Sequence, residues 1–140
     1  MTRAAALRKR VQAHLAEQRE LVRTLLRLRA QLQGSVFTRY GECGKAGCAC
    51  QQGQKHGPYY VLSTRVRGLS GFAYLEGDKA EEARRLVERH KEFQARLRRL
   101  RRVNTDLVAL LRRYQQQMAR QGNRRLGLKS TRKPTQKAEL

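Results

Sequence analysis

The chain has 140 residues, of which 32 are Lys or Arg and 11 are Asp or Glu, so its formal net charge is +21. This length leaves room for one domain, and no apolar run reaches the roughly 18 residues that a membrane-spanning helix needs. A charge of this sign and size repels itself and attracts polyanions. Nucleic acid is therefore the expected class of partner, and an anionic membrane surface is the weaker alternative.

No secretory signal is recognisable, although the first ten residues, MTRAAALRKR, have the composition of a short transit peptide. Because they continue directly into a helical pattern, we expect a cytoplasmic protein, associated with the nucleoid if it binds DNA. The chain has 3 cysteines, an odd number that cannot all pair within one chain. A reducing compartment and a bound metal are therefore favoured over disulfides.

Residues 1–33 are predicted to form an N-terminal amphipathic helix. No Pro or Gly occurs from residue 4 to residue 33, and one row of positions recurs with steps that alternate between three and four. That row consists of Leu7, Val11, His14, Gln18, Leu21, Leu25, Leu28 and Leu32. Gly34 follows, where helices commonly end.

Residues 34–77 are predicted to form a small β-module with three strands. The segments 36–40, 59–66 and 71–75 are rich in β-forming residues, and Gly68 to Gly71 is expected to form the turn between the last two. A loop rich in Gly and Cys, residues 41–57, lies between the first two strands.

Residues 78–121 are predicted to form a second amphipathic helix, with Asp78 as N-cap and Glu81 in a capping box. Gly122 is expected to end this helix, and residues 122–140 are predicted to be a disordered basic tail. The predicted inner row is Leu86, His90, Phe93, Leu97, Leu100, Asn104, Leu107, Leu111, Tyr114 and Met118.

The two rows have similar lengths, so the predicted fold class is mainly α with a small β insert: an antiparallel helical hairpin, as in a coiled coil, with the β-module between its helices. Placing Leu32 against Leu86 puts His14 near Asn104. These two polar residues either share one layer and fix the register, or both point partly to solvent.

Further apolar residues exceed what two helices can bury, which predicts a homodimer or packing of the β-module on the helices: Leu15, Val22, Leu26, Val87, Val103, Val108 and Leu110.

A candidate metal site lies in the Gly-rich loop. Cys43, Cys48, Cys50 and His56 follow the spacing C-x4-C-x-C-x5-H, which supplies a full tetrahedral set of zinc ligands with no open position. A structural zinc ion would contribute on the order of 10 kcal/mol of apparent binding free energy, enough to fold a loop with little core. Free thiols beside a turn histidine are one alternative, and an iron–sulfur cluster is another.

Two groups of basic residues are candidates for contacts with nucleic acid. In the β-module, basic residues are interleaved with tyrosines that suit phosphate, sugar and base contacts: Arg39, Tyr40, Lys45, Lys55, Tyr59, Tyr60, Arg65 and Arg67. Strand alternation places Tyr59 and Tyr60 on opposite faces, so one can pack inward while the other meets a partner.

The second group lies in residues 96–104. These arginines lack nearby acids in the sequence, and such dense like charge favours a phosphate-binding face, with a solvated coiled-coil surface as the alternative: Arg96, Arg98, Arg99, Arg101 and Arg102.

No nucleophile motif, phosphate loop or convincing carboxylate pair occurs, so we expect no enzymatic activity. The favoured function is a non-enzymatic nucleic-acid-binding protein that binds DNA in preference to RNA, mainly through phosphates. One alternative is a protein–protein adaptor for a mobile-element, phage or nucleic-acid-processing enzyme. A second is a thiol or metal sensor that uses Cys43, Cys48 and Cys50.

The segments GSVFTRY, ECGKAGCAC and GQKHGPYYVLS resemble an uncharacterised family of small bacterial and archaeal proteins. Its members carry a CGKxxCxC segment, then HGPYY and a strand, then a long helix. The resemblance covers the motif region well and the second helix loosely. It implies that Gly44, Lys45, Gly57, Pro58 and the two adjacent tyrosines belong to the motif together with the metal ligands. It implies no particular activity.

Overall fold

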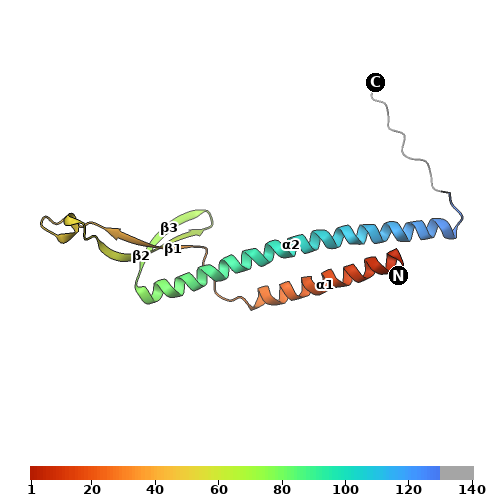
Figure 1. Cartoon of the computed structure of the whole chain (residues 1–140), viewed down its shortest axis with the longest axis horizontal. Coiled ribbons are helices and arrows are strands. Elements are labelled where there is room, and N and C mark those ends of the chain that lie inside the picture. Colours follow the sequence, from red (N-terminus) through yellow and green to blue (C-terminus); the bar gives the residue numbers. More distant parts are fainter. Residues whose placement is uncertain (130–140) are drawn as a thin grey trace, which may run out of the picture. The chain divides into compact units, whose positions relative to one another are not determined.

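The computed structural model describes residues 1–129, which form two helices and a three-stranded antiparallel sheet (Figure 1). The predicted combination of long helices with a small β insert is therefore confirmed. In chain order the elements are α1 (Arg3–Arg27), β1 (Gly34–Gly41), the short 3-10 helix η1 (Ala49–Gln52), β2 (His56–Val66), β3 (Leu69–Leu75) and α2 (Gly77–Arg125). No helix within the described residues is long and apolar enough to cross a membrane.

The chain divides into two compact units, which are described separately. The sheet unit comprises residues 22–98: the end of α1, the whole sheet and the start of α2. The helical unit comprises residues 1–21 and the chain from Arg99 onward. Both helices thus contribute to both units.

In the sheet unit, α1 ends at Arg27, so the prediction of helix to residue 33 is wrong. The residues that follow find partners outside the helix. The backbone N–H of Leu32 donates to the carbonyl oxygen of Leu86 at 3.1 Å, and the carbonyl oxygen of Gln33 accepts from the N–H of Arg65 at 3.3 Å. Tertiary hydrogen bonds therefore override the helix propensity of this segment. The predicted proximity of Leu32 and Leu86 is correct.

The strands have the order β1-β2-β3, so β2 is central and pairs antiparallel with both neighbours. β2 begins at His56, three residues before its predicted start at Tyr59. The turn between β2 and β3 consists of Arg67 and Gly68, with φ angles of 49° and 78°. Two successive positive φ angles define the type I′ turn that suits a two-residue hairpin. The predicted turn from Gly68 to Gly71 is therefore wrong.

One face of the sheet lies against the first turns of α2. The guanidinium of Arg84 sits 5.5 Å from the centre of the Tyr60 ring. Leu62, on the same face as Tyr60, is buried. Buried small residues on α2, Ala80 and Ala83, with Val87 one turn later, complete this core. The core is small, as the low aromatic content requires.

α2 starts at Gly77 and continues through Gly122 to Arg125, so the prediction that Gly122 ends the helix is wrong. A single glycine in an exposed helix costs only about 1 kcal/mol, which does not stop a long helix. The helix ends where the N–H of Leu128 donates to the carbonyl of Asn123 and that of Gly127 to the carbonyl of Arg124. The first part of the predicted tail is therefore helical. Residues 130–140 lie outside the described residues.

In the helical unit, side-chain hydrogen bonds join α1 to α2. The guanidinium of Arg8 donates to the hydroxyl of Tyr114 at 2.8 Å. The side-chain N–H of Gln18 donates to the side-chain oxygen Oδ1 of Asn104 at 2.7 Å. Since the earlier residue of α1 meets the later residue of α2, the two helices pair in opposite directions here.

The inner row of α2 in this unit differs from the predicted one. Val103 and Leu110 are buried, whereas Asn104 and Leu111 are exposed. His14 lies 4.0 Å from Asp106. Of the two alternatives for His14 and Asn104, the hydrogen-bonded shared layer is therefore wrong, because Asn104 bonds to Gln18, and the alternative that both are partly exposed is correct.

Candidate metal centre and basic surfaces

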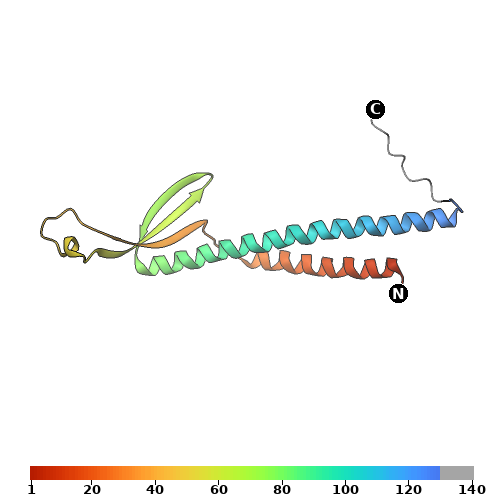
Figure 2. The same cartoon turned by 45° about the horizontal axis from the view of Figure 1, so that its top comes forward.

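The sheet itself brings the ends of the cysteine loop together. β1 is irregular between Arg39 and Gly41, and Gly41 then pairs with His56. This pair closes the loop of residues 42–55, which projects beyond the strands (Figure 2). Cys43 comes two residues after Gly41, the last residue of β1. His56 is the first residue of β2 and pairs with Gly41. Strand pairing thus brings the side chains of Cys43 and His56 together from opposite ends of the loop.

The other two ligands come from η1. Cys48 is the residue before this short helix, and Cys50 lies within it and is fully buried. The N–H of Gln51 donates to the carbonyl of Cys48 at 3.1 Å, which forms the tight turn. The turn directs both sulfur atoms to the same place.

The four ligand atoms of Cys43, Cys48, Cys50 and His56 all lie within 4.8 Å of one another. The Sγ atoms of Cys43 and Cys50 are 3.5 Å apart, and the Sγ of Cys48 is 3.2 Å from Nε2 of His56. Two sulfur atoms bound to one tetrahedral zinc ion at about 2.3 Å would be about 3.8 Å apart. The separations are therefore close to those of a tetrahedral set, and these residues could hold a metal ion.

The thiols of this cluster ionise unequally. The backbone N–H of Cys50 makes the largest contribution that lowers the pKa of Cys48, and hydrogen bonds with the side chains of Cys43, Cys50 and His56 help to bring it to about 6. The backbone N–H of Cys43 lowers the pKa of Cys50, but burial and the neighbouring thiols outweigh it, so this pKa is raised. One thiolate forms readily, and a cation is needed to stabilise more than one in so small a space.

Gly57 holds the end of this loop against β1. Its φ angle is +135°, which side chains rarely allow, and a Cβ atom there would lie 2.9 Å from the carbonyl oxygen of Arg39 and from the ring of Tyr40. Only glycine fits this close approach of the two strands. The motif therefore needs Gly57 for its backbone and the adjacent His56 for its side chain.

A pocket of about 470 Å³ adjoins the metal centre, on the sheet face that points away from α2. It is lined by Arg39, Gly41, Glu42, Cys43, His56, Tyr59 and Tyr74. The Tyr59 and Tyr74 rings meet edge to face with centroids 6.4 Å apart, and the guanidinium of Arg39 donates to the Tyr74 hydroxyl at 3.2 Å. Two residues of the cluster thus form one wall and two aromatic rings form another.

The predicted contact residues of the β-module fall in different places. Tyr59 is exposed, whereas Tyr60 is the tyrosine that packs inward beneath Arg84. Arg39 lines the pocket. The other basic residues are exposed around the metal loop or near the β2–β3 turn, and they do not converge on one point: Lys45, Lys55, Arg65 and Arg67.

The predicted arginines of α2 also separate into two kinds. Arg96 forms an ion pair with Glu92, and Nε of Arg99 donates to Glu17 of α1 at 2.6 Å. This contact lowers the pKa of Glu17 and raises that of Arg99. The expectation that these arginines lack acidic partners is therefore wrong for two of them, because the acids come from one turn earlier and from the other helix.

The other three predicted arginines, together with two later arginines of α2, form what we call the arginine stripe. Its members are exposed, and no ion pair involves them within residues 1–129: Arg98, Arg101, Arg102, Arg112 and Arg113. At 100° per residue these positions lie within an arc of about 120° on one side of α2, and the centre of that arc is about 130° from the buried Val103 and Leu110. The stripe covers about 22 Å of helix.

Reasoning from the sequence missed three exposed aromatic residues on the sheet face that carries the pocket: Phe37, Phe72 and Tyr74. The sequence held a signal for them, since Phe37 and Arg39 on β1, and Phe72 and Tyr74 on β3, are each separated by one residue. Such pairs share a face. Only the strand register shows that both pairs share the same face.

The fold defines the chain as one with a compact Cys3His cluster in a small antiparallel sheet, which lies in the sequence between two basic helices. A family model described as "Domain of unknown function (DUF6788)" matches residues 12–85, and the chain belongs to this family. The matched region covers most of α1, the whole sheet with its metal centre, and the first turns of α2. No curated protein and no solved structure matches the chain.

Proposed function

We propose that this protein is a non-enzymatic nucleic-acid-binding protein whose arginine stripe contacts the phosphates of duplex DNA. The observation that carries the proposal is the set of five exposed arginines on one side of α2 that have no acidic partner within the described residues. Like charges so close together are unfavourable on an isolated helix. A polyanion removes that repulsion and gains from release of its counterions.

The shape of the stripe favours a duplex. Its arginines follow one helix for about 22 Å, roughly two-thirds of a turn of B-DNA. Arg99 and Arg96 take little part, because their guanidinium groups already bind carboxylates. Contacts of this kind position a protein on the backbone and read little sequence.

The metal centre has a structural role in this proposal. Four protein ligands fill a tetrahedral site, so zinc bound there has no open position for a substrate. Zinc would fix residues 42–55, and with them the exposed Lys45 and Lys55, in one conformation. Iron–sulfur clusters also use cysteine ligands, and the metal content of the purified protein distinguishes the two.

The proposal is tested by titrating nuclease-treated, zinc-loaded protein onto labelled duplex DNA, duplex RNA and single-stranded DNA over a range of salt concentrations. Five phosphate contacts predict a slope of log affinity against log salt of about −4.5 on duplex DNA, or a loss of roughly 500-fold between about 50 and 200 mM salt. Tighter binding to duplex DNA than to duplex RNA is expected. Weak binding to all three at physiological salt would overturn the proposal and favour a protein adaptor.

We also propose that the helical unit forms a two-helix coiled coil that dimerises. Apolar residues on the same unit remain exposed on both helices: Leu15 on α1 with Val108 and Leu111 on α2. A shallow groove lies beside Leu15. A second copy would cover these side chains, which a two-helix pair leaves in water.

Replacing Val108 and Leu111 with Glu is expected to convert a dimer to a monomer, as measured by light scattering during size-exclusion chromatography. The control replaces Gln116 and Gln121 with Glu, which adds the same charge at exposed positions on the same helix. A wild-type protein that is monomeric at all concentrations would show that the dimer proposal is wrong.

A further inference from the structure

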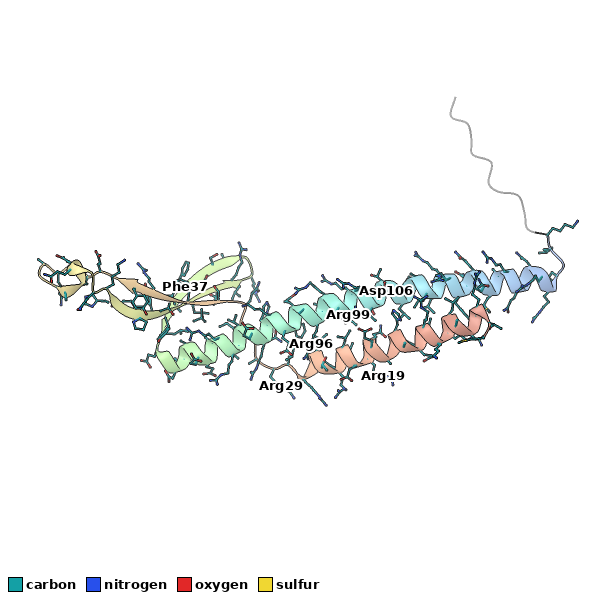
Figure 3. The ribbon with its side chains drawn as sticks, in the orientation of Figure 1. Arg19, Arg29, Phe37, Arg96, Arg99 and Asp106 are labelled. Carbon is teal, nitrogen blue, oxygen red and sulfur yellow. The ribbon has the colours of Figure 1, made fainter. Side chains whose placement is uncertain are left out.

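The sheet has a second face, which carries aromatic side chains that no part of the sheet unit covers. Phe37 pairs with Val61, and Val61 pairs with Tyr74, so these three side chains share one face. Alternation along β2 and β3 adds Tyr59 and Phe72. We call Phe37, Tyr59, Phe72 and Tyr74 the aromatic face. Figure 3 marks the position of Phe37 on β1.

These four rings are far more exposed than aromatic residues in a core. The exposed fractions are 42% for Phe37, 45% for Tyr59, 72% for Phe72 and 65% for Tyr74. Val61, at the centre of the same face, is only 4% exposed because the rings surround it. The opposite face already packs against α2 through Tyr60 and Leu62. A group of exposed rings of this kind is typical of a binding surface.

The charge around the aromatic face identifies the kind of partner. From Gly34 to Leu75 the chain has five basic residues and one acid, Glu42. Arg39 lies on the aromatic face beside Tyr59 and Tyr74, and Arg65 follows on the same side of β2. A partner must therefore offer both flat apolar surfaces and negative charge.

We propose that the aromatic face binds unpaired bases of a single-stranded nucleic acid, with the phosphates beside Arg39 and Arg65. Every base has a flat face that stacks on an aromatic ring, and its backbone carries the charge that the arginines require. In a duplex the bases are stacked on one another and do not offer these faces. This surface is therefore distinct in its ligand from the arginine stripe.

The pocket at the end of the aromatic face suits one nucleotide. Its volume of about 470 Å³ falls within the range of small-molecule sites, and Tyr59, Tyr74 and Arg39 line it. Cys43 and His56 form the neighbouring wall. Metal binding would thereby fix the shape of the pocket as well as the loop. The aromatic face and pocket together give stacking positions for several successive bases.

This inference rests on the proposed function, since both require binding of nucleic acid, and its test separates the two. The experiment measures the anisotropy of labelled oligothymidine and oligouridine of about 16 nucleotides, the upper end of the length that such surfaces cover, and of a duplex DNA. Tyr59→Ala and Phe72→Ala are each expected to weaken single-strand binding about 5- to 100-fold. Duplex affinity is expected to stay unchanged. Comparing the two oligonucleotides distinguishes DNA from RNA.

Tyr40→Ala is the matched control, because Tyr40 is also an exposed tyrosine and lies on β1 outside the aromatic face. Tyr59→Phe keeps the ring and is expected to retain binding. Each variant is checked for zinc content and circular dichroism. Wild-type binding to the duplex together with unchanged single-strand binding by both alanine variants would overturn this inference and leave the proposed function intact. If the alanine variants leave single-strand binding unchanged but lower the molecular mass of the protein in solution, the face instead joins two copies of the chain.

A direct readout of stacking is available because the chain contains no tryptophan. In Phe72→Trp the new indole is the sole tryptophan and replaces one aromatic ring with another. Stacking with a base is expected to quench its emission on addition of oligothymidine. Emission that is unaffected at saturating oligonucleotide would place the single strand elsewhere. This variant also keeps the proposal testable if an alanine variant does not fold.

Discussion

Removing the metal is expected to unfold residues 42–55 while both helices remain folded. Within this loop Cys50 is the single buried residue, and the only regular structure is the four residues of η1. The loop therefore has no hydrophobic core to hold it without a metal. Structural zinc supplies an apparent binding free energy on the order of 10 kcal/mol, which far exceeds the stability of most single contacts.

Zinc content, measured by mass spectrometry of the purified protein, is expected to fall from one ion per chain to near zero in Cys48→Ser and in Cys50→Ser. Limited proteolysis of either variant is expected to cut between Cys43 and His56, while the helical circular dichroism signal is largely retained. Substitution by cobalt gives a second measurement, because tetrahedral thiolate coordination produces intense visible absorption bands.

The histidines provide a matched control for the ligand set. The chain has three, and His14 and His90 lie on the helices away from the cluster. His56→Gln is expected to weaken zinc binding, whereas His14→Gln and His90→Gln are expected to leave the metal content unchanged. The metal centre would be disproved by a folded, protease-resistant loop in protein freed of metal.

The metal centre could be predicted from sequence because its ligands are close together in the chain. Cys43, Cys48, Cys50 and His56 occupy one loop, so no long-range contact had to be known to group them. The strands were also recognisable from local composition. The exact ends of the strands were not recognisable, because the turn at Arg67 and Gly68 needs a positive φ angle at Arg67, which residues other than glycine rarely adopt.

The register of the helices and the composition of the sheet faces could not be predicted in the same way. Leu32 and Gln33 leave the helical conformation to pair with α2 and β2, and nothing in their own side chains indicates this. On α2, Val103 and Leu110 are buried, whereas Asn104 and Leu111 are not. The apolar residues of this helix spread around much of its circumference, so the sequence allows several different faces to be the buried one. Such choices depend on the whole packing.

Neutralising the arginine stripe is expected to give the largest loss of duplex binding. The triple variant Arg98→Gln, Arg101→Gln and Arg102→Gln removes three predicted phosphate contacts. Each contact contributes about 0.9 to the salt slope, so the slope is expected to fall in magnitude by about 2.7. The change leaves the buried residues and the Arg99–Glu17 ion pair untouched, so the helical unit is expected to keep its stability.

A control with the same loss of net charge distinguishes a defined surface from a general effect of charge. Arg29, Arg85 and Arg89 are exposed and lie outside the stripe, and their replacement by Gln also removes three positive charges. If the stripe is the binding surface, the control keeps most of the slope. If both triple variants lose the same amount of salt slope, the net charge of the whole protein attracts the DNA and the arginine stripe is not a defined binding surface. Because slope counts the phosphates neutralised, this comparison tests where the nucleic acid lies as well as whether it binds.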